Sequence, residues 1–296
     1  MTHRRAVLTM LAVTLMWSIA GVVSRHLETA RSFEVTFWRS AFNALALVIL
    51  LSWLRGPVPL WRSIKNGGRS LWISGACWCV MFTAFMLAIT LTTVANVLVT
   101  MAVAPLFTAL VARFALGHRL ATRTWAAIAV AGVGIAWMYG QEFSASDPQH
   151  LLGTAVALCV PIASAINWTL MQHLQSKDKR VNMAPNDMLP AVLLGALLSA
   201  AIMLPLSLPF AASAHDMALL ALLGTVQLAI PCLLAMTVAS VLSAPEVSLL
   251  CLLEVVFGVA WAWLGAGETP SSAVIGGGLL VLGALAANEA VALRRA

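Results

Sequence analysis

Long apolar stretches alternate with short polar segments along the whole chain of 296 residues. A helix that crosses the hydrocarbon core of a bilayer needs about 20 mostly apolar residues. Ten stretches meet this requirement, near residues 6–24, 34–54, 71–91, 94–116, 122–140, 152–174, 188–206, 217–238, 246–264 and 272–293. None shows the alternation of apolar and polar positions that is typical of barrel strands. Because backbone groups in lipid must be satisfied internally, the pattern predicts an all-α polytopic membrane protein with ten transmembrane helices.

The first apolar stretch follows two arginines, as the core of a signal peptide does. It runs from Ala6 to Ser24, which is longer than the usual core of such a signal. It then ends at Arg25 without a cleavage site of the Ala-x-Ala kind. We therefore expect a retained first transmembrane helix.

The composition is that of a protein whose main solvent is lipid. Hydrophobic residues make up 61% of the chain, and charged residues only 9%, against about 25% in soluble domains. The mean hydropathy is +0.94. These values exclude a soluble enzyme, a nucleic-acid binder and a disordered chain. The five cysteines all lie in apolar stretches, where cysteine behaves as a small hydrophobic residue.

The basic residues give the expected orientation. If the N-terminus is cytoplasmic, 14 of the 17 Lys and Arg residues lie in cytoplasmic segments. Only Arg25 and Arg31 then lie in outer loops, and Arg39 falls within the second span. Because cytoplasmic loops carry an excess of Lys and Arg, we expect both termini to be inside. The same distribution attributes the net charge of +6 to contacts with anionic lipid rather than with nucleic acid.

The two halves of the chain resemble each other at an offset of about 150 residues. The turn Leu116-Gly117-His118 falls on Ala266-Gly267-Glu268, and Trp17-Ser18 falls on Trp168-Thr169. We therefore expect an N-terminal five-helix repeat, residues 1–145, and a C-terminal five-helix repeat, residues 146–296. Because five is an odd number of spans, the two repeats must have opposite orientations. Inverted repeats are common in secondary transporters, whose substrate site lies near the membrane midplane.

Three short motifs carry a family resemblance that extends over essentially the whole chain. Leu15-Met-Trp-Ser18, Phe37-Trp-Arg-Ser40 and Val103-Ala-Pro-Leu106 resemble the EamA-type members of the drug/metabolite transporter superfamily. The stretch Leu264–Pro270 resembles the turn of that family. Within the superfamily the chain is most similar to the bacterial amino-acid exporters of the YddG type. This resemblance implies ten helices, a bacterial inner membrane and export of aromatic and other amino acids.

Two charged residues lie well away from the ends of their predicted spans, at a depth where a charge costs about 2.5–3.5 kcal/mol on insertion scales. Glu254 is nearly central in the ninth span. It is either a proton or substrate-amine site or a neutral carboxyl that pairs with a neighbouring helix. Arg39 is either a partner for a substrate carboxylate or an arginine that snorkels or pairs helices. Polar uncharged residues such as Asn43 and Gln227 are expected to face the bundle.

Several large apolar side chains are expected at membrane depth. These Trp, Phe and Met side chains form a candidate pocket, because Met adapts to varied ligands. For each of them, packing within the core is the alternative. With the charged and polar candidates, the predicted substrate-binding residues are Trp17, Trp78, Met81, Phe82, Met101, Asn167, Trp168 and Glu254.

These features together favour a secondary transporter over other membrane proteins. The chain has no GxxxxGK[ST] loop for a nucleotide and no HExxH motif, so we expect no enzyme activity, no metal and no cofactor. A channel is disfavoured because inverted halves suit alternating access. The expected substrate is an amino acid, with small lipophilic drugs or other metabolites as the alternative. The residues leave open the coupling to protons and the choice between monomer and homodimer.

Overall fold

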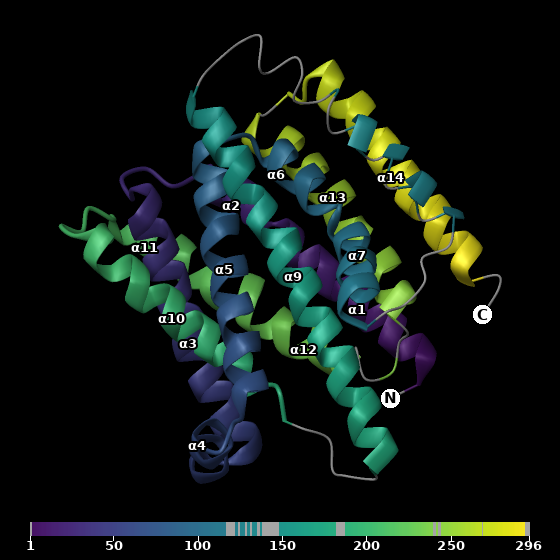
Figure 1. Ribbon diagram of the computed structural model, residues 1–296. Coiled ribbons are helices and arrows are strands. Elements are labelled where there is room, and N and C mark those ends of the chain that lie inside the picture. The colour runs from purple at the N-terminus through teal and green to yellow at the C-terminus, as the bar shows by residue number, and fades with distance from the viewer. Residues whose placement is uncertain are drawn as a thin grey trace.

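Every regular element that the computed structural model describes is a helix (Figure 1). The described residues are 2–116, 148–181, 187–238, 241, 244–267 and 269–293, with most of 122–137, namely 122, 123, 125–127, 129, 130, 132–134 and 137. In the first part of the chain the helices are α1 (His3–Ser18), α2 (Ala20–Ser24), α3 (Ser32–Arg55), α4 (Pro57–Lys65), α5 (Arg69–Leu91), α6 (Val94–Met101) and α7 (Ala104–Leu116). In the second part they are α9 (Pro148–Val181), α10 (Pro190–Ser207), α11 (Ala214–Leu222), the π-helix η1 (Leu223–Ala229), α12 (Ile230–Val238), α13 (Ala244–Ala266) and α14 (Ser272–Leu293).

Six of the expected spans are confirmed as helical segments that are long and apolar enough to cross a membrane. They are His3–Ser24, Ser32–Arg55, Arg69–Leu91, Leu151–Met171, Pro190–Ser207 and Ala214–Val238. Each lies within a few residues of its predicted position, because the apolar run itself sets the length of the helix. The expected fifth span, 122–140, is described in part, and its described residues are helical, whereas residues 141–147 of the loop after it lie outside the described residues.

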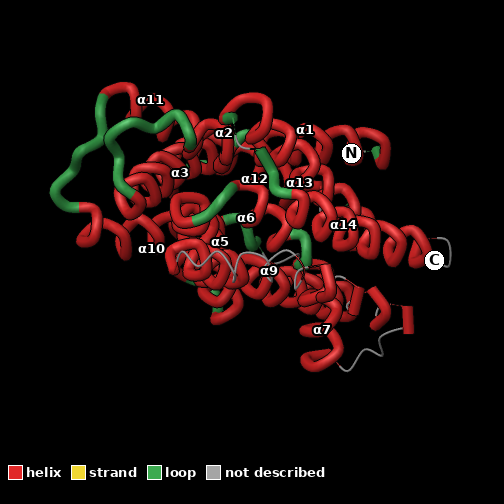
Figure 2. The backbone as a smooth tube through the Cα atoms, turned by 90° about the horizontal axis from the view of Figure 1, so that it is seen from above, coloured by secondary structure: helices red, strands yellow, loops and turns green. Residues whose placement is uncertain are grey.

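The helices from the two parts of the chain are interleaved. α5 lies between α9 and α10, and α3 packs against α10 and η1 (Figure 1). α1 packs against α12 and α13, and α6 lies against α9 and α13. From above, α1 is on one side and α7 and α9 are on the opposite side, with α6 and α13 between them (Figure 2). Segments far apart in the sequence therefore form most of the interior.

Two hydrophobic clusters fill most of the interior. The first surrounds α6, in which every residue from Val94 to Thr100 is buried. The second joins α3, α5, α10 and α12 and includes Leu47, Trp78 and Phe82. Because α6 is buried on all sides, it packs against protein rather than lipid, in the way expected for a helix that is hydrophobic all round.

Prolines and a glycine differ in their effect on the expected helices. The expected fourth span is divided at Ala102 and Val103 into α6 and α7, because Pro105 lacks the N–H that would bond to Met101. Pro161, by contrast, lies within the continuous helix α9. Gly56, with a φ of 85°, makes the sharp turn from α3 into α4.

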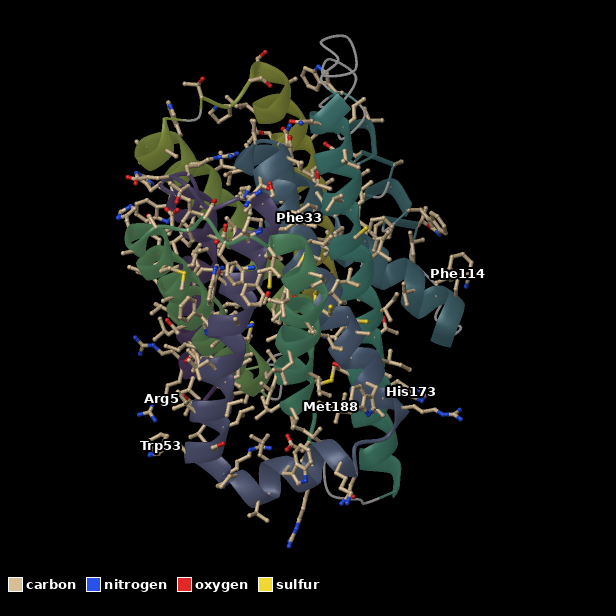
Figure 3. All side chains as sticks on the ribbon, turned by 90° about the vertical axis from the view of Figure 1, so that its left-hand side faces the viewer. Arg5, Phe33, Trp53, Phe114, His173 and Met188 are labelled. Carbon is tan, nitrogen blue, oxygen red and sulfur yellow. The ribbon has the colours of Figure 1, made fainter. Side chains whose placement is uncertain are left out.

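The short helix α4 was not expected, because its nine residues are too few to span a membrane. Leu60 is buried against the second cluster, whereas Trp61 is exposed. Trp53 and Arg5 lie toward the same end of the molecule as α4, and Phe33 lies nearer the other end (Figure 3). α4 therefore marks the end of the bundle that the charge distribution predicts to be cytoplasmic.

Candidate functional site

The most unusual group in the interior is the guanidinium of Arg39, on α3. The residue is 2% exposed, although it carries a charge. Its Nη2 atom donates a hydrogen bond to Oε1 of Gln227 at 2.9 Å. Its Cζ atom lies 5.5 Å from the centroid of the Phe85 ring, a favourable cation–π distance. The Nε and Nη1 atoms of Arg39 have no hydrogen-bond partner.

Gln227 connects this guanidinium to the first helix. Its Nε2 atom donates to the backbone oxygen of Trp17 at 3.0 Å, so Gln227 joins α3 and α1. Gln227 lies in η1, four residues before Pro231. Because Pro231 has no N–H and its ring would clash with the Gln227 carbonyl in an α-helix, the wider π-turn is favoured here. Pro231 is therefore accommodated by a π-helix, which positions the Gln227 amide.

Glu254, on α13, supplies an acidic side chain that interacts with this guanidinium from a distance. It is half-buried, and its carboxylate interacts electrostatically with Arg39 and with the thiol of Cys251. Among the described residues, however, Glu254 forms no direct ion pair with Arg39. A buried charge without a bonded counter-charge costs several kcal/mol. The interior thus holds one guanidinium and one carboxyl group, from different parts of the chain, that do not contact each other.

Four of the predicted site residues lie together in the second hydrophobic cluster. They are Trp17, Trp78, Met81 and Phe82. The rings of Trp78 and Phe82 are 5.4 Å apart and tilted by 35°. The Nε1 atom of Trp78 is buried and has no partner, so this apolar surface carries an unused donor. Cys232 completes the contact between this cluster and α12.

The other predicted residues occupy different surroundings. Met101 packs against the first cluster, which Met81 also contacts. Asn167 is fully buried, and its Oδ1 atom accepts a hydrogen bond from Ser74 at 2.6 Å. Trp168 is half-buried and belongs to neither of the two large clusters. Its role in a pocket stays a prediction.

From the sequence, Arg39 was one candidate partner for a substrate carboxylate, and Asn43 and Gln227 were expected to face the bundle, but none of the three was among the predicted substrate-binding residues. The structure shows that Arg39 does not snorkel to an interface but pairs helices inside the bundle. Asn43, one turn after Arg39, is fully buried, and neither of its amide atoms has a partner. All three are polar or charged residues at membrane depth, and such residues are candidates for a functional site.

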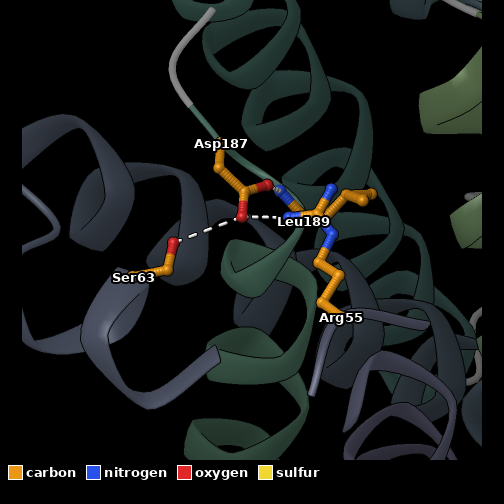
Figure 4. A network of polar contacts seen from close by, with 4 residues as sticks. All are labelled: Arg55, Ser63, Asp187 and Leu189. Atoms are coloured by element: carbon orange, nitrogen blue, oxygen red, sulfur yellow. Dashed lines mark hydrogen bonds and ion pairs between the residues drawn. The ribbon is translucent and has the colours of Figure 1, made fainter. Parts of the chain in front are cut away.

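A second polar network lies at the end of the bundle where α4 is found. Asp187 forms an ion pair with Arg55 and accepts hydrogen bonds from Ser63 and the backbone N–H of Leu189 (Figure 4). A pocket of about 260 Å³ lies beside it, lined by Ser63, Asn66, Ser70 and Met188 among others. No group of three metal-ligating side chains occurs among the described residues.

Comparisons with known proteins agree with this architecture. No curated protein sequence matches the chain. Thirteen chains of solved structures match it, and one, described as "Crystal structure of protein", aligns over 100% of both chains with a TM-score of 0.61 and 19% identity. That likeness concerns the fold alone. Residues 4–140 of the chain are similar to the EamA-like transporter family.

Proposed function

We propose that the protein is a secondary active transporter that exports amino acids, aromatic and others, across the bacterial inner membrane by alternating access. The similarity of residues 4–140 to the EamA-like transporter family implies transport of small molecules through a membrane. The six long apolar helices support a multi-pass arrangement. Four shorter apolar helical segments, Val94–Thr108, Trp125–Gly134, Leu253–Ala266 and Ile275–Ala284, coincide with the other four expected spans.

The observation that carries this proposal is a matched set of helix contacts. If residues 1–145 and 146–296 are repeats, α1 corresponds to α9, α3 to α10, α5 to α11 through α12, and α6 with α7 to α13. The contact of α5 with α9 then corresponds to that of α12 with α1, and the contact of α5 with α10 to that of η1 with α3. Likewise, α7 on α9 corresponds to α13 on α1.

Each of these contacts and its counterpart is present. Two halves related by a twofold axis in the membrane plane produce such a set. That is the arrangement in which one half rocks against the other around a fixed midplane site. The candidate site supports this interpretation, because Arg39 and Trp78 come from one half and Gln227 and Glu254 from the other.

Amino acids are the proposed substrates because the site offers both of the surfaces that they require. The cluster around Trp78 and Phe82 is apolar and aromatic and suits a large side chain. Arg39 supplies a guanidinium and Glu254 a carboxyl group, which suit a carboxylate and an ammonium group. Outward transport is proposed from the resemblance to bacterial exporters, together with cytoplasmic termini from the distribution of basic residues.

The test is transport by purified protein in proteoliposomes. A panel of labelled amino acids is followed in both directions, with and without a pH gradient. We expect exchange of aromatic amino acids, and a Trp78→Ala variant that folds normally should transport them more slowly. Absence of exchange for every amino acid, together with transport of neutral lipophilic compounds, would contradict the proposed substrate class but leave a transporter.

A further inference from the structure

The guanidinium of Arg39 has two partners, and the backbone of Arg39 is closely packed. Gln227 binds one terminal nitrogen, and the ring of Phe85 lies under the guanidinium. The backbone of α3 is also pressed against η1, because an added Cβ at Gly224 would lie 2.7 Å from the Arg39 backbone oxygen. The side chain therefore starts from a fixed position, and part of its donor set is already used.

The remaining donors of Arg39 form a preorganised recognition group. Nε carries one hydrogen and Nη1 carries two, and none of them has an acceptor. Asn43, one turn along the same helix, adds an amide whose oxygen and nitrogen are also free. Both residues are at least 98% buried, so bulk water does not satisfy these donors. Such a set of donors suits an anionic oxygen ligand, because hydrogen bonds from a guanidinium to a carboxylate are among the strongest.

The internal partners of Arg39 do not provide that ligand. Gln227 is neutral, and Glu254 acts on the guanidinium only from beyond ion-pair distance. A neutral amide orients the guanidinium without cancelling its charge. A glutamate at position 227 would have cancelled it. The choice of glutamine keeps the positive charge available.

We infer that Arg39 binds the carboxylate of the transported molecule, and that Gln227 orients the guanidinium for that contact. Because Phe85 covers one face of the guanidinium, the carboxylate approaches in its plane, where the N–H groups point. The aromatic cluster nearby then receives the side chain of the ligand. The inference rests on the proposed function in placing the site on the substrate pathway, and it narrows the substrates to carboxylates.

The test compares two ligands that differ only in the carboxylate. Binding of phenylalanine and of phenylalaninamide is measured by calorimetry on the full-length protein in lipid nanodiscs. We expect phenylalanine to bind about tenfold more tightly or better, which corresponds to one strong charged hydrogen bond. Arg39→Gln should remove this preference while leaving the affinity for phenylalaninamide nearly unchanged.

A second variant keeps the test decisive if Arg39→Gln does not fold. Gln227→Glu has nearly the same shape and supplies an internal carboxylate next to Arg39, so it should also abolish the preference for phenylalanine. Arg55→Gln, on the same helix but paired with Asp187, is the matched control and should keep the preference. Retention of the preference in Gln227→Glu, or equal losses for both ligands in Arg39→Gln, would overturn the inference.

Failure of the amino-acid proposal can be told apart from failure of this inference. If the protein binds neither phenylalanine nor its amide, the same measurement is made with 3-phenylpropionate and 3-phenylpropionamide. A preference for the carboxylate that depends on Arg39 would then support the inference for substrates that are not amino acids. No preference in either pair would overturn it.

Discussion

Glu34 and Asp216 each bind the loop that precedes the other's helix. Both are fully buried carboxylates at the third position of a helix, Glu34 in α3 and Asp216 in α11. Glu34 accepts hydrogen bonds from the backbone N–H groups of Ala211 and Ala212. Asp216 accepts them from the backbone N–H groups of Glu28, Thr29 and Ala30.

These reciprocal contacts join two loops that are distant in sequence. Thr29 adds a side-chain hydrogen bond to Asp216 at 2.7 Å, and Arg31 donates to the backbone oxygen of Pro209 at 2.6 Å. The ring of Phe210 stacks on Phe37 with centroids 5.4 Å apart. Five backbone donors of these two loops are therefore satisfied by carboxylates rather than by water. We call the loops 25–31 and 208–213 with these two carboxylates the clasp.

The clasp gives the first prediction. Asp216→Asn keeps the size of the side chain but removes the charge and one acceptor oxygen, so it should destabilise the fold by about 2 kcal/mol. Thermal unfolding of the purified protein should show a midpoint several degrees lower. Glu28→Gln, in the same loop but exposed, should stay within about 0.5 kcal/mol of the parent protein. Equal effects of both changes would contradict a special role for Asp216.

The close approach of η1 and α3 gives the second prediction. A Cβ at position 224 would lie 2.6 Å from the Cβ of Phe42 and 2.8 Å from the backbone nitrogen of Asn43. Gly224→Ala should therefore force the helices apart and destabilise the protein by about 1–3 kcal/mol. Gly132 has open space around its added Cβ, so Gly132→Ala should be neutral or slightly stabilising. Thermal unfolding of both variants decides the matter.

The ion pair of Arg55 and Asp187 gives the third prediction. Its side chains are 37% and 31% exposed, so Asp187→Asn should change stability by less than about 1 kcal/mol. Loss of the ion pair should nevertheless make the adjacent pocket more accessible. A cysteine placed at Ser70, in a background without the native cysteines, should then react faster with a thiol reagent. The double charge swap Arg55→Asp with Asp187→Arg should restore the slow rate, and an unchanged rate in Asp187→Asn would remove any closing role for the pair.

Glu254 gives the fourth prediction, which concerns coupling. The hypothesis that it exchanges a proton during transport is motivated by its half-buried carboxylate near the charge of Arg39. Glu254→Gln keeps the shape but cannot titrate, so counterflow exchange should persist while any stimulation by a pH gradient disappears. Reduced affinity in both assays would instead assign Glu254 to the substrate amine. Transport identical to the parent protein would leave it a structural residue.

The sequence predicted the positions of most helices well, but it did not predict which side of each helix packs against which neighbour. Apolar length locates a span along the membrane normal, and the segments Ser32–Arg55 and Arg69–Leu91 lie close to the expected positions for that reason. Hydropathy does not say which side of an apolar helix meets which neighbour. The hydrogen bond from Arg39 to Gln227 joins residues 188 positions apart, so no local pattern could reveal it.

Other features could not be predicted from the sequence because they depend on contacts in the tertiary structure. Glu34 and Asp216 lie near the ends of apolar runs, where a carboxylate ordinarily reaches water. Only the packed loops show that both are buried. Pro231 indicates an irregular helix, but that the irregularity is a π-helix follows from the clash of its ring with the Gln227 carbonyl. Trp168 was paired with Trp17 by the repeat alone, and the repeat does not determine which of the two packs inside.

The two ends of the bundle differ in the polar contacts that hold the helices and loops together at each end. In the described residues the clasp end is held by backbone hydrogen bonds to two buried carboxylates, whereas at the α4 end the partly exposed Asp187 pairs with Arg55 and accepts a hydrogen bond from Ser63. Breaking the clasp means exposing all of those donors together, which makes it a slow event. If the α4 end faces the cytoplasm and the protein works by alternating access, opening toward the outside is expected to be the slower of the two opening steps.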